Sequence, residues 1–299
     1  MALEAQQDQT PKIPATTQIG TVQLTVRSLE RSLQFYEQLL GLKRDEQPDG
    51  SVLLGGAGRL PPLLSLIADS SAPPRDPRQT GLFHFAVLVP TRRDLAVALV
   101  RLAQGGWHLD GASDHLVSEA LYLSDPDGNG IEIYRDRARS EWRRNPDGGI
   151  AMATLPLNLE DLLDELKEAP PDPAADTLMP EGTRVGHVHL QVAELDQIEQ
   201  FYAGVLGFDI VTRSYPGALF VSAGGYHHHV GLNTWNSRGG SIPAPGGIGL
   251  RAYELRLGSA DALGEVLARL KLAGIGGEAV TDRATLVRDP SGNGVLLTL

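Results

Sequence analysis

The chain of 299 residues repeats itself, and this internal duplication restricts its fold more than any other feature. Residues 20–42 and 186–208 align without gaps at an offset of 166 and share ten of 23 residues, including a Phe-Tyr pair and the glycine that follows it. A second pair follows at an offset of 164, where DPDGNGIEIY at 125–134 corresponds to DPSGNGVLLTL at 289–299. A unit of about 165 residues is therefore duplicated, and duplicated units fold alike.

Each repeat divides again into two similar modules. Residues 20–26 alternate apolar and polar side chains as a strand does, and residues 33–40 then carry apolar side chains at helical spacing. Gly41 ends this helix. The same order of strand, helix and short strands starts again near residues 82, 185 and 250. These patterns predict an α+β protein made of four βαβββ modules in tandem.

The repeats also set the expected boundaries along the chain. We expect a flexible N-terminal tail at residues 1–18 and a first domain, with modules 1 and 2, at residues 19–135. A linker at 136–184 then leads to a second domain, with modules 3 and 4, at 185–299. The linker should hold one helix at 158–168, which Asn158 would cap.

Composition excludes several classes of function. The chain has 37 acidic and 26 basic residues, a net charge of −11, which argues against a nucleic-acid partner. No apolar run approaches the 18 residues of a membrane span, and residues 1–18 lack the apolar core of a secretory signal, so we expect a cytoplasmic protein. Cysteine is absent, so any metal must be held by His, Asp or Glu.

The module pattern, with FY…LG after the first strand and DP-x-GN-G before the last, resembles the vicinal oxygen chelate superfamily. Glyoxalases, bleomycin-resistance proteins and extradiol ring-cleaving dioxygenases belong to it, and the chain is most similar to the two-domain bacterial catechol 2,3-dioxygenase-like proteins. The resemblance covers residues 19–299. It implies that modules pair into two cup-shaped sheets, with metal ligands on the first and last strands of the modules.

The aligned ligand positions differ between the modules. The first strands of modules 1 to 4 carry Thr21, His84, His187 and Ala252, and the last strands of modules 2 and 4 carry Glu132 and Leu296. Only the pairing of module 2 with module 3, within one chain or between two, joins His84, Glu132 and His187. We predict that these three residues bind the metal and that modules 1 and 4 form a metal-free cup.

Two histidines and one carboxylate form the facial triad of non-haem Fe(II) oxygenases, which leaves open positions on the metal. The resemblance then implies an extradiol dioxygenase that acts on a small aromatic diol with dioxygen. Fe(II) is the metal that the family favours, and Mn(II) or another divalent metal is the alternative. A homo-oligomer is compatible with the sequence, and a membrane partner is not expected.

The run His227-His228-His229 supplies the candidate acid–base group. We expect it inside a strand at 227–234, where alternation puts His227 and His229 on one face. Relatives in the family carry a His pair at this place whose second member transfers protons, and that residue maps to His229. Imidazole suits this role because its pKa lies near neutrality. Alternatively, His229 is a fourth metal ligand, as in a glyoxalase-like site.

Two further residues are candidates for orienting the substrate. Tyr122 precedes Glu132 by ten residues, which is the spacing of the active-site tyrosine in ring-cleaving relatives, and His115 lies in the polar loop before it. We predict catalytic roles for both. The arginines of 135–146 are typical of a solvated face, and the alternatives are that Trp142 among them caps the mouth of the site or a subunit contact.

Two other functions compete with a dioxygenase. One is a glyoxalase-type enzyme, a lyase, isomerase or thiol transferase that uses the metal without redox chemistry. The other is a metal-holding binding or resistance protein. Such binding proteins are usually two-module chains, so four modules with three ligands argue against the latter.

Overall fold

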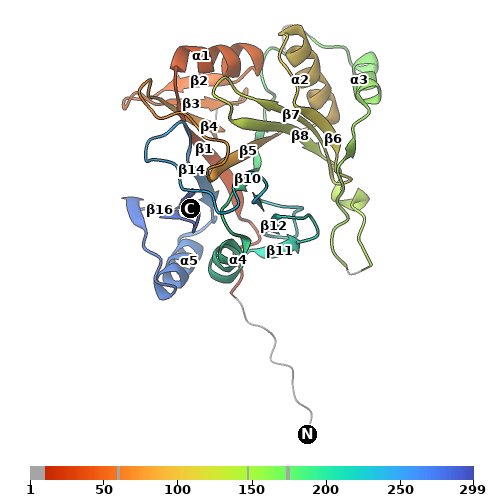
Figure 1. The fold of residues 1–299 in the computed structure, drawn as a ribbon. Coiled ribbons are helices and arrows are strands. Elements are labelled where there is room, and N and C mark those ends of the chain that lie inside the picture. Colours follow the sequence, from red (N-terminus) through yellow and green to blue (C-terminus); the bar gives the residue numbers. More distant parts are fainter. Residues whose placement is uncertain (1–10, 59–60, 147, 173–175) are drawn as a thin grey trace.

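A computed structural model describes residues 11–58, 61–146, 148–172 and 176–299 (Figure 1). Module 1 comprises β1 (Gln18–Val26), α1 (Leu29–Leu33), the π-helical η1 (Gln34–Leu39), β2 (Lys43–Glu46), β3 (Val52–Gly55) and β4 (Leu64–Ala68). Module 2 comprises β5 (Gly81–Leu88), α2 (Arg92–Gln104), β6 (Gly111–Asp114), β7 (Ser118–Ser124) and β8 (Gly130–Asp136). Module 3 comprises β10 (Arg184–Gln191), α4 (Leu195–Glu199), the π-helical η3 (Gln200–Val205), β11 (Asp209–Thr212), β12 (Ala218–Ser222) and β13 (Val230–Asn233). Module 4 comprises β14 (Gly249–Arg256), α5 (Ala260–Leu272), β15 (Glu278–Thr281), β16 (Ala284–Arg288) and β17 (Gly294–Thr298).

The modules pair across the two halves of the chain and not within them. Modules 1 and 4 form an eight-stranded sheet in the order β15-β16-β17-β14-β1-β4-β3-β2. Modules 2 and 3 form a nine-stranded sheet in the order β11-β12-β13-β10-β5-β8-β7-β6-β9. In Figure 1 the red and blue strands accordingly lie together on the left, and the yellow-green and teal strands lie on the right. The α+β fold of four βαβββ modules is confirmed, and residues 19–135 and 185–299 do not each form a sheet of their own.

The duplicated motifs join the two sheets to each other. Tyr36, in the helix of module 1, donates a hydrogen bond of 2.8 Å to Asp125 in the turn of module 2. Tyr202 of module 3 donates in the same way to Asp289 of module 4, at 3.2 Å. All four side chains are buried. Because consecutive modules lie in different sheets, each Tyr–Asp pair connects one sheet to the other.

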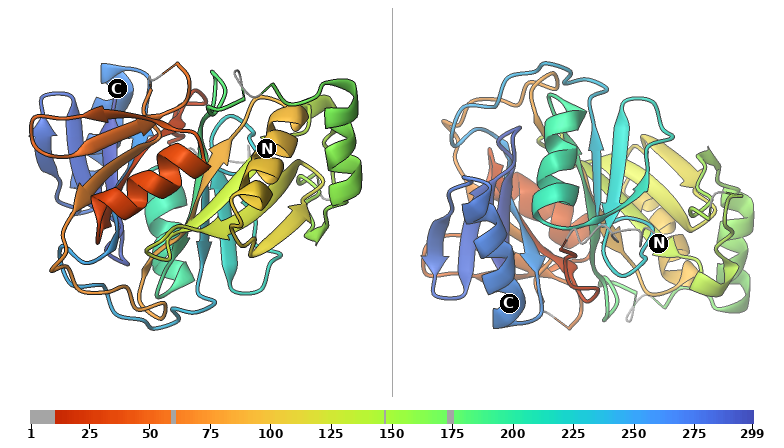
Figure 2. Two further views of the ribbon diagram at one scale, coloured as in Figure 1. Left: turned by 90° about the horizontal axis from the view of Figure 1, so that it is seen from above. Right: turned by 90° about the horizontal axis from the view of Figure 1, so that it is seen from below.

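Helices cover the sheets at two opposite ends of the molecule. Figures 1 and 2 show α1, α2 and α3 at one end and α4 and α5 at the other. Helix α2 begins at Thr91, whose side chain accepts from the Asp94 N–H in a capping box. After the first helix of each half, Gly41 and Gly207 adopt φ of 74° and 88°, which only glycine adopts without strain.

The linker contributes more than its predicted helix. Helix α3 (Leu159–Glu168) is capped by Asn158, which accepts from the Asp161 N–H, as the sequence predicted. The same segment also supplies the short 3-10 helix η2 (Arg139–Glu141) and strand β9 (Leu155–Pro156), which pairs with β6 at the edge of the nine-stranded sheet. The linker is therefore part of this sheet.

The N-terminal segment differs from the expected flexible tail where it is described. Residues 1–10 of the predicted tail lie outside the described residues. Ile13 is buried and its N–H donates to the Gly207 carbonyl at 2.9 Å, so residues after 10 pack against module 3. Within the described part of the chain, none of the helices has the length and apolarity that crossing a membrane requires.

Candidate active site

Three adjacent strands at the centre of the nine-stranded sheet bring His84, Glu132 and His187 together. Antiparallel pairing of β5 with β10 places His187 opposite Ala86, and parallel pairing of β5 with β8 places Glu132 beside the same alanine. Oε2 of Glu132 lies 3.0 Å from Nε2 of His187 and 3.1 Å from Nε2 of His84. One ligand atom from each residue lies within 4.8 Å of the others.

Glycine 130 allows this close approach of the strands. A Cβ atom at Gly130 would lie 2.1 Å from the carbonyl oxygen of Phe83 and 3.1 Å from Cβ of His84. Any other residue would push β8 away from β5 and move Glu132 away from His84. The last glycine of the DPDGNG motif is therefore required for the geometry of the cluster and not for the turn alone.

The chemistry of this cluster fits a divalent transition metal. The three side chains are 9% or less exposed, and Nε2 of each histidine faces the same oxygen of Glu132. Burial raises the pKa of Glu132, but the facing His187 and His84 more than offset this and lower it well below its usual range. Burial lowers the pKa of His187, although Glu132 raises it. A buried carboxylate with two imidazoles that offer lone pairs is the donor set of a metal site.

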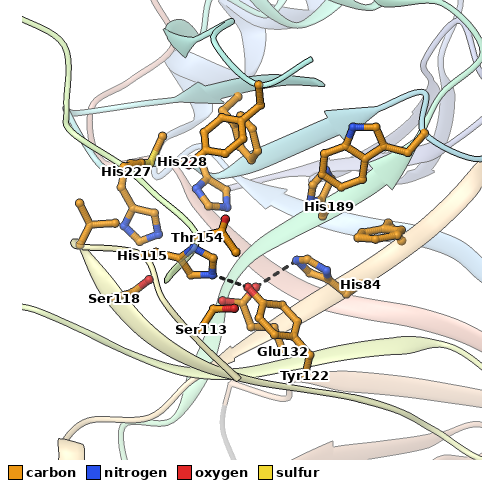
Figure 3. Close-up of a pocket in the computed structure, with 16 residues that line it drawn as sticks. His84, Ser113, His115, Ser118, Tyr122, Glu132, Thr154, His189, His227 and His228 are labelled. Carbon is orange, nitrogen blue, oxygen red and sulfur yellow. Dashed lines mark hydrogen bonds and ion pairs between the residues drawn. The ribbon is translucent and has the colours of Figure 1, made fainter. Parts of the chain in front are cut away.

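A cavity of about 210 Å³ opens beside Glu132 and His84 (Figure 3). Strands β5 to β8, β10 and β12, the linker, and the segments before β12 and on either side of β13 all contribute to its lining. The lining residues are Phe83, His84, Ser113, His115, Val117, Ser118, Tyr122, Glu132, Met152, Thr154, His189, Tyr215, Phe220, His227, His228 and Trp235. A concave, mostly apolar cavity with a few convergent polar groups is the usual form of a small-molecule site.

The structure brings Tyr122 and His115 to this cavity as a hydrogen-bonded pair. Nδ1 of His115 lies 2.8 Å from the carbonyl oxygen of Ala153, which can only accept, so this nitrogen carries the proton. Nε2 of His115 then accepts from the Tyr122 hydroxyl at 2.7 Å. Burial and the nearby Glu132 carboxylate raise the pKa of Tyr122 well above its usual range, so it stays a neutral phenol.

The histidine run lies in the loop before β13 and not inside a strand, so the expected strand at 227–234 is wrong in its first three residues. Strict alternation of faces does not hold in this loop. His227 and His228 line the cavity. His229 is directed elsewhere: its Nδ1 accepts from the Ala223 N–H at 3.1 Å, and its ring borders a separate hollow together with Arg139 and Arg184. The structure therefore does not bring His229 to the cluster.

His227 and His228 lie close to the predicted ligands. One nitrogen of each, together with one of His187, lies within 4.8 Å of the other two. The ring centroids of His187 and His228 are 4.1 Å apart. Burial lowers the pKa of both His227 and His228 well below the usual range, so both are neutral near pH 7. The sequence pattern predicted a strand at His227 and His228, where the structure has a loop. Only the pairing register of β13, which fixes where that strand begins, could have corrected this prediction.

Other residues of the site carried weak signals or none in the sequence. His189 lies in the cavity wall beside His84, and Nδ2 of Asn233 lies 3.0 Å from its Nε2. Trp142 packs on His227 at a centroid distance of 5.4 Å and is not among the residues that line the cavity. The aromatic residues Phe83, Phe220 and Trp235 come from separate segments, so no local pattern points to them.

The eight-stranded sheet has no comparable cluster among the described residues. Thr21 and Ala252 stand at the positions that correspond to the two histidines. Within the same residues, the groups of three His, Asp or Glu side chains suited to a metal are His84–Glu132–His187 and His187–His227–His228. Both belong to the sheet made by modules 2 and 3.

Comparisons with known proteins agree with this architecture. A family model described as "Glyoxalase/Bleomycin resistance protein/Dioxygenase superfamily" matches residues 18–133 and 184–297. A catechol-2,3-dioxygenase from Bacillus subtilis (strain 168) is 45% identical over 277 residues, which cover 92% of this chain and 94% of that protein.

Solved structures share the fold at low sequence identity. Glyoxalase I from Zea mays superposes with a TM-score of 0.55 at 15% identity, over 95% of this chain and 92% of that one. The cppA protein from Streptococcus pneumoniae TIGR4 superposes with a TM-score of 0.56 at 13% identity, over 96% and 99% of the two chains. Two family matches that together span most of the sequence, one in each repeat, show that the chain belongs to the glyoxalase/bleomycin resistance protein/dioxygenase superfamily.

Proposed function

We propose that this chain is an extradiol ring-cleaving dioxygenase that uses dioxygen to open a catechol-type aromatic diol. The observation that carries the proposal is the buried group of two histidines and one glutamate at the side of a small apolar cavity. The Bacillus subtilis relative at 45% identity, a catechol-2,3-dioxygenase, supports the same activity.

In this proposal His84, Glu132 and His187 hold a divalent metal, with Fe(II) preferred and Mn(II) as the alternative. When bound, such a metal supplies adjacent coordination positions for the diol and for dioxygen. The protein contributes a rigid donor set, because each ligand lies on a strand at the centre of a sheet. It also keeps the three side chains almost fully buried, which limits their contact with water.

The proposal assigns proton transfer to His228 in place of His229. His228 lines the cavity, is half-buried, and leaves its Nδ1 without a hydrogen-bond partner. Because burial keeps this imidazole neutral, it is in the form that accepts a proton from a diol hydroxyl and later returns one.

Tyr122 and His115 act in the proposal as a fixed pair that orients a substrate oxygen. The Ala153 carbonyl sets the tautomer of His115, and His115 in turn holds the hydroxyl proton of Tyr122. The phenol oxygen keeps a lone pair that accepts from the diol. Such positioning lowers the entropic part of the barrier.

The alternative is a glyoxalase-type enzyme that uses the metal only as a Lewis acid. It requires a fourth protein ligand, and His227 or His228 would have to supply it. A dioxygenase consumes dioxygen and this alternative does not, so a single measurement separates them. A homo-oligomeric state and a cytoplasmic location stay predictions.

The experiment is oxygen uptake by protein purified without air and loaded with Fe(II) or Mn(II). With catechol, 3-methylcatechol and 4-methylcatechol we expect uptake of about one dioxygen per diol together with a yellow product. The Glu132→Gln variant should lose metal and activity. Glu254→Gln, a half-buried carboxylate in the other sheet, is the matched control and should retain both. Absence of uptake with both metals and all three diols would contradict the proposal.

A further inference from the structure

One wall of the cavity is built from aromatic side chains. Phe83 packs against Trp235 with ring centroids 5.5 Å apart, and Phe220 packs against Tyr215 at the same distance. His189 joins the two pairs, with centroid distances of 5.1 Å to Phe83 and 5.5 Å to Phe220. This aromatic wall, defined as Phe83, His189, Tyr215, Phe220 and Trp235, meets His84 through Phe83 and His189, whose ring centroids lie 5.4 and 5.0 Å from that of His84.

Two serine hydroxyls lie on another side of the cavity. Figure 3 shows Ser113 and Ser118 beside His115, across the cavity from His84 and His189. A diol held at Glu132 and His84 therefore has an apolar surface on one side and neutral hydrogen-bonding groups on the other.

Charge is the second feature of the cavity. Among the described residues that line it there is no lysine or arginine, and Glu132 is the one carboxylate. The arginines nearest in sequence to Glu132 are engaged elsewhere. Arg135 pairs with Glu119 at 2.7 Å, and Arg137 pairs with Asp114 at 2.8 Å and with Glu119 at 3.0 Å.

The aromatic wall and the uncharged lining determine which substituents on the diol ring fit the cavity. A carboxylate that leaves water for an apolar wall loses its hydration, and no cation in the lining replaces it. A methyl, ethyl or halogen substituent instead gains by burial against aromatic rings. Serine hydroxyls on the far side can donate to an anion but cannot neutralise it.

We infer that this site selects uncharged aromatic diols with small apolar ring substituents and discriminates against diols that carry a ring carboxylate. The inference rests on the proposed function, since it names the substrate class of that same site. The volume of about 210 Å³ restricts the buried part of the substrate to one ring with a small substituent. Trp235 is 48% exposed, so larger groups would extend past it toward solvent.

The first test compares 4-methylcatechol with 3,4-dihydroxybenzoate, which differ only in a methyl group against a carboxylate. We expect the metal-loaded enzyme to use the methyl compound with a kcat/KM at least ~100-fold higher, from initial rates of oxygen uptake. Values within about threefold of each other would overturn the inference.

The second test adds a cation to the aromatic wall. In Trp235→Arg the new charge sits at a partly exposed position and therefore keeps part of its hydration. This variant should raise the rate for 3,4-dihydroxybenzoate relative to 4-methylcatechol by ~10-fold or more. Trp235→Gln removes the same aromatic ring without adding a charge, so as the control it should shift the ratio clearly less than Trp235→Arg does. An unchanged ratio in Trp235→Arg would overturn the placement of the substituent against this wall.

A third measurement separates this inference from the proposed function. Both diols are titrated without air into metal-loaded protein, and binding is followed by tryptophan fluorescence, to which Trp235 contributes from the cavity wall. If neither diol is cleaved in air, the proposed function fails. Tighter binding of 4-methylcatechol would still support selection against charge, and equal affinities would overturn it.

Discussion

At the scale of single residues, the start of one strand decides which histidines serve the site. Strand β13 begins at Val230, so His227 to His229 lie in a loop whose side chains do not alternate. His228 consequently packs against His187, while His229 accepts a backbone N–H on the far side of the loop. A shift of one residue thus moves the candidate acid–base group from one imidazole to its neighbour.

Substitution of the two neighbouring histidines tests this assignment. His228→Asn should lower kcat for catechol cleavage by ~10²- to 10⁴-fold, the usual effect of removing a general acid–base. His229→Asn should keep kcat within about threefold and change stability by less than about 1 kcal/mol, because the asparagine Oδ1 can accept the Ala223 N–H in place of Nδ1. Stopped-flow rates and urea unfolding give the two values. A larger loss of kcat in His229→Asn than in His228→Asn would reverse the assignment.

Asp136 should make the stability of the protein depend on pH. Burial raises the pKa of Asp136 from 3.8 to about 6, although the Tyr226 hydroxyl, which donates to it at 3.0 Å, lowers the pKa. The folded state therefore binds the proton more tightly than the unfolded state. The resulting stabilisation is complete below pH ~4 and is lost as the pH rises through about 6.

Asp136→Asn isolates this effect. Between pH 4 and 6.5 the unmodified protein should lose up to ~3 kcal/mol that the variant does not lose. Urea unfolding at several pH values measures both curves, after correction for the groups common to the two proteins. Parallel curves would show that Asp136 titrates with an ordinary pKa in the folded protein.

At the scale of elements, the duplicated motifs serve the connection between sheets more than the site. Tyr36 and Asp125, and their copies Tyr202 and Asp289, are the Tyr of each FY motif and the Asp of each DP-x-GN-G motif. Each aspartate also accepts from two backbone N–H groups of its own turn. One buried carboxylate therefore shapes the turn and accepts the tyrosine hydroxyl from the helix of the preceding module.

Removal of the tyrosine hydroxyl should weaken this connection. We expect Tyr36→Phe to cost about 1 to 2 kcal/mol in urea unfolding, since a buried carboxylate loses one donor. In a double-mutant cycle with Asp125→Asn the two changes should couple by about 0.5 kcal/mol or more. Tyr202→Phe repeats the experiment in the second copy. Additive effects in both copies would show that the repeated Tyr and Asp act independently.

Most elements follow from local pattern, and their exceptions have physical reasons. Helix α3 begins after Asn158 as expected because a side-chain cap is a local interaction. The helices after β1 and β10 turn π-helical at Gln34 and Gln200, and strand β9 adds to the edge of a sheet from within the linker. Neither the π-helical turns nor strand β9 has a signal in the local sequence, because both depend on the segments that pack against them in the folded chain.

At the scale of the whole molecule, each sheet is shared by the two halves of the chain. The central pairs are β1 with β14 and β5 with β10, so the longest interfaces join residues far apart in sequence. The ligands follow this arrangement, since His84 and Glu132 come from the first half and His187 from the second. Neither half can assemble the three-residue cluster alone.

Unfolding should therefore be a single cooperative transition, although the chain is a duplication. We expect calorimetry to give one peak with equal calorimetric and van't Hoff enthalpies. Saturation with Mn(II) should move the whole transition to higher temperature. At a free Mn(II) concentration of 100 times Kd, the free energy of unfolding should rise by roughly 2.7 kcal/mol. Glu132→Gln should abolish most of this shift. Two resolved peaks, with only one responding to metal, would contradict the shared architecture.

The sequence by itself determined the duplication, the four modules and the three candidate ligands His84, Glu132 and His187. The duplication and the modules follow from local periodicity and from alignment of the repeats, and the ligand positions follow from the resemblance to the superfamily applied to those aligned modules. Tertiary structure decided that modules 2 and 3 pair within one chain, that His228 and not His229 faces the cavity, and that an uncharged aromatic wall lines one part of it. The reason is physical: strand pairing and side-chain packing join segments far apart in sequence, and only the folded chain brings their atoms into contact.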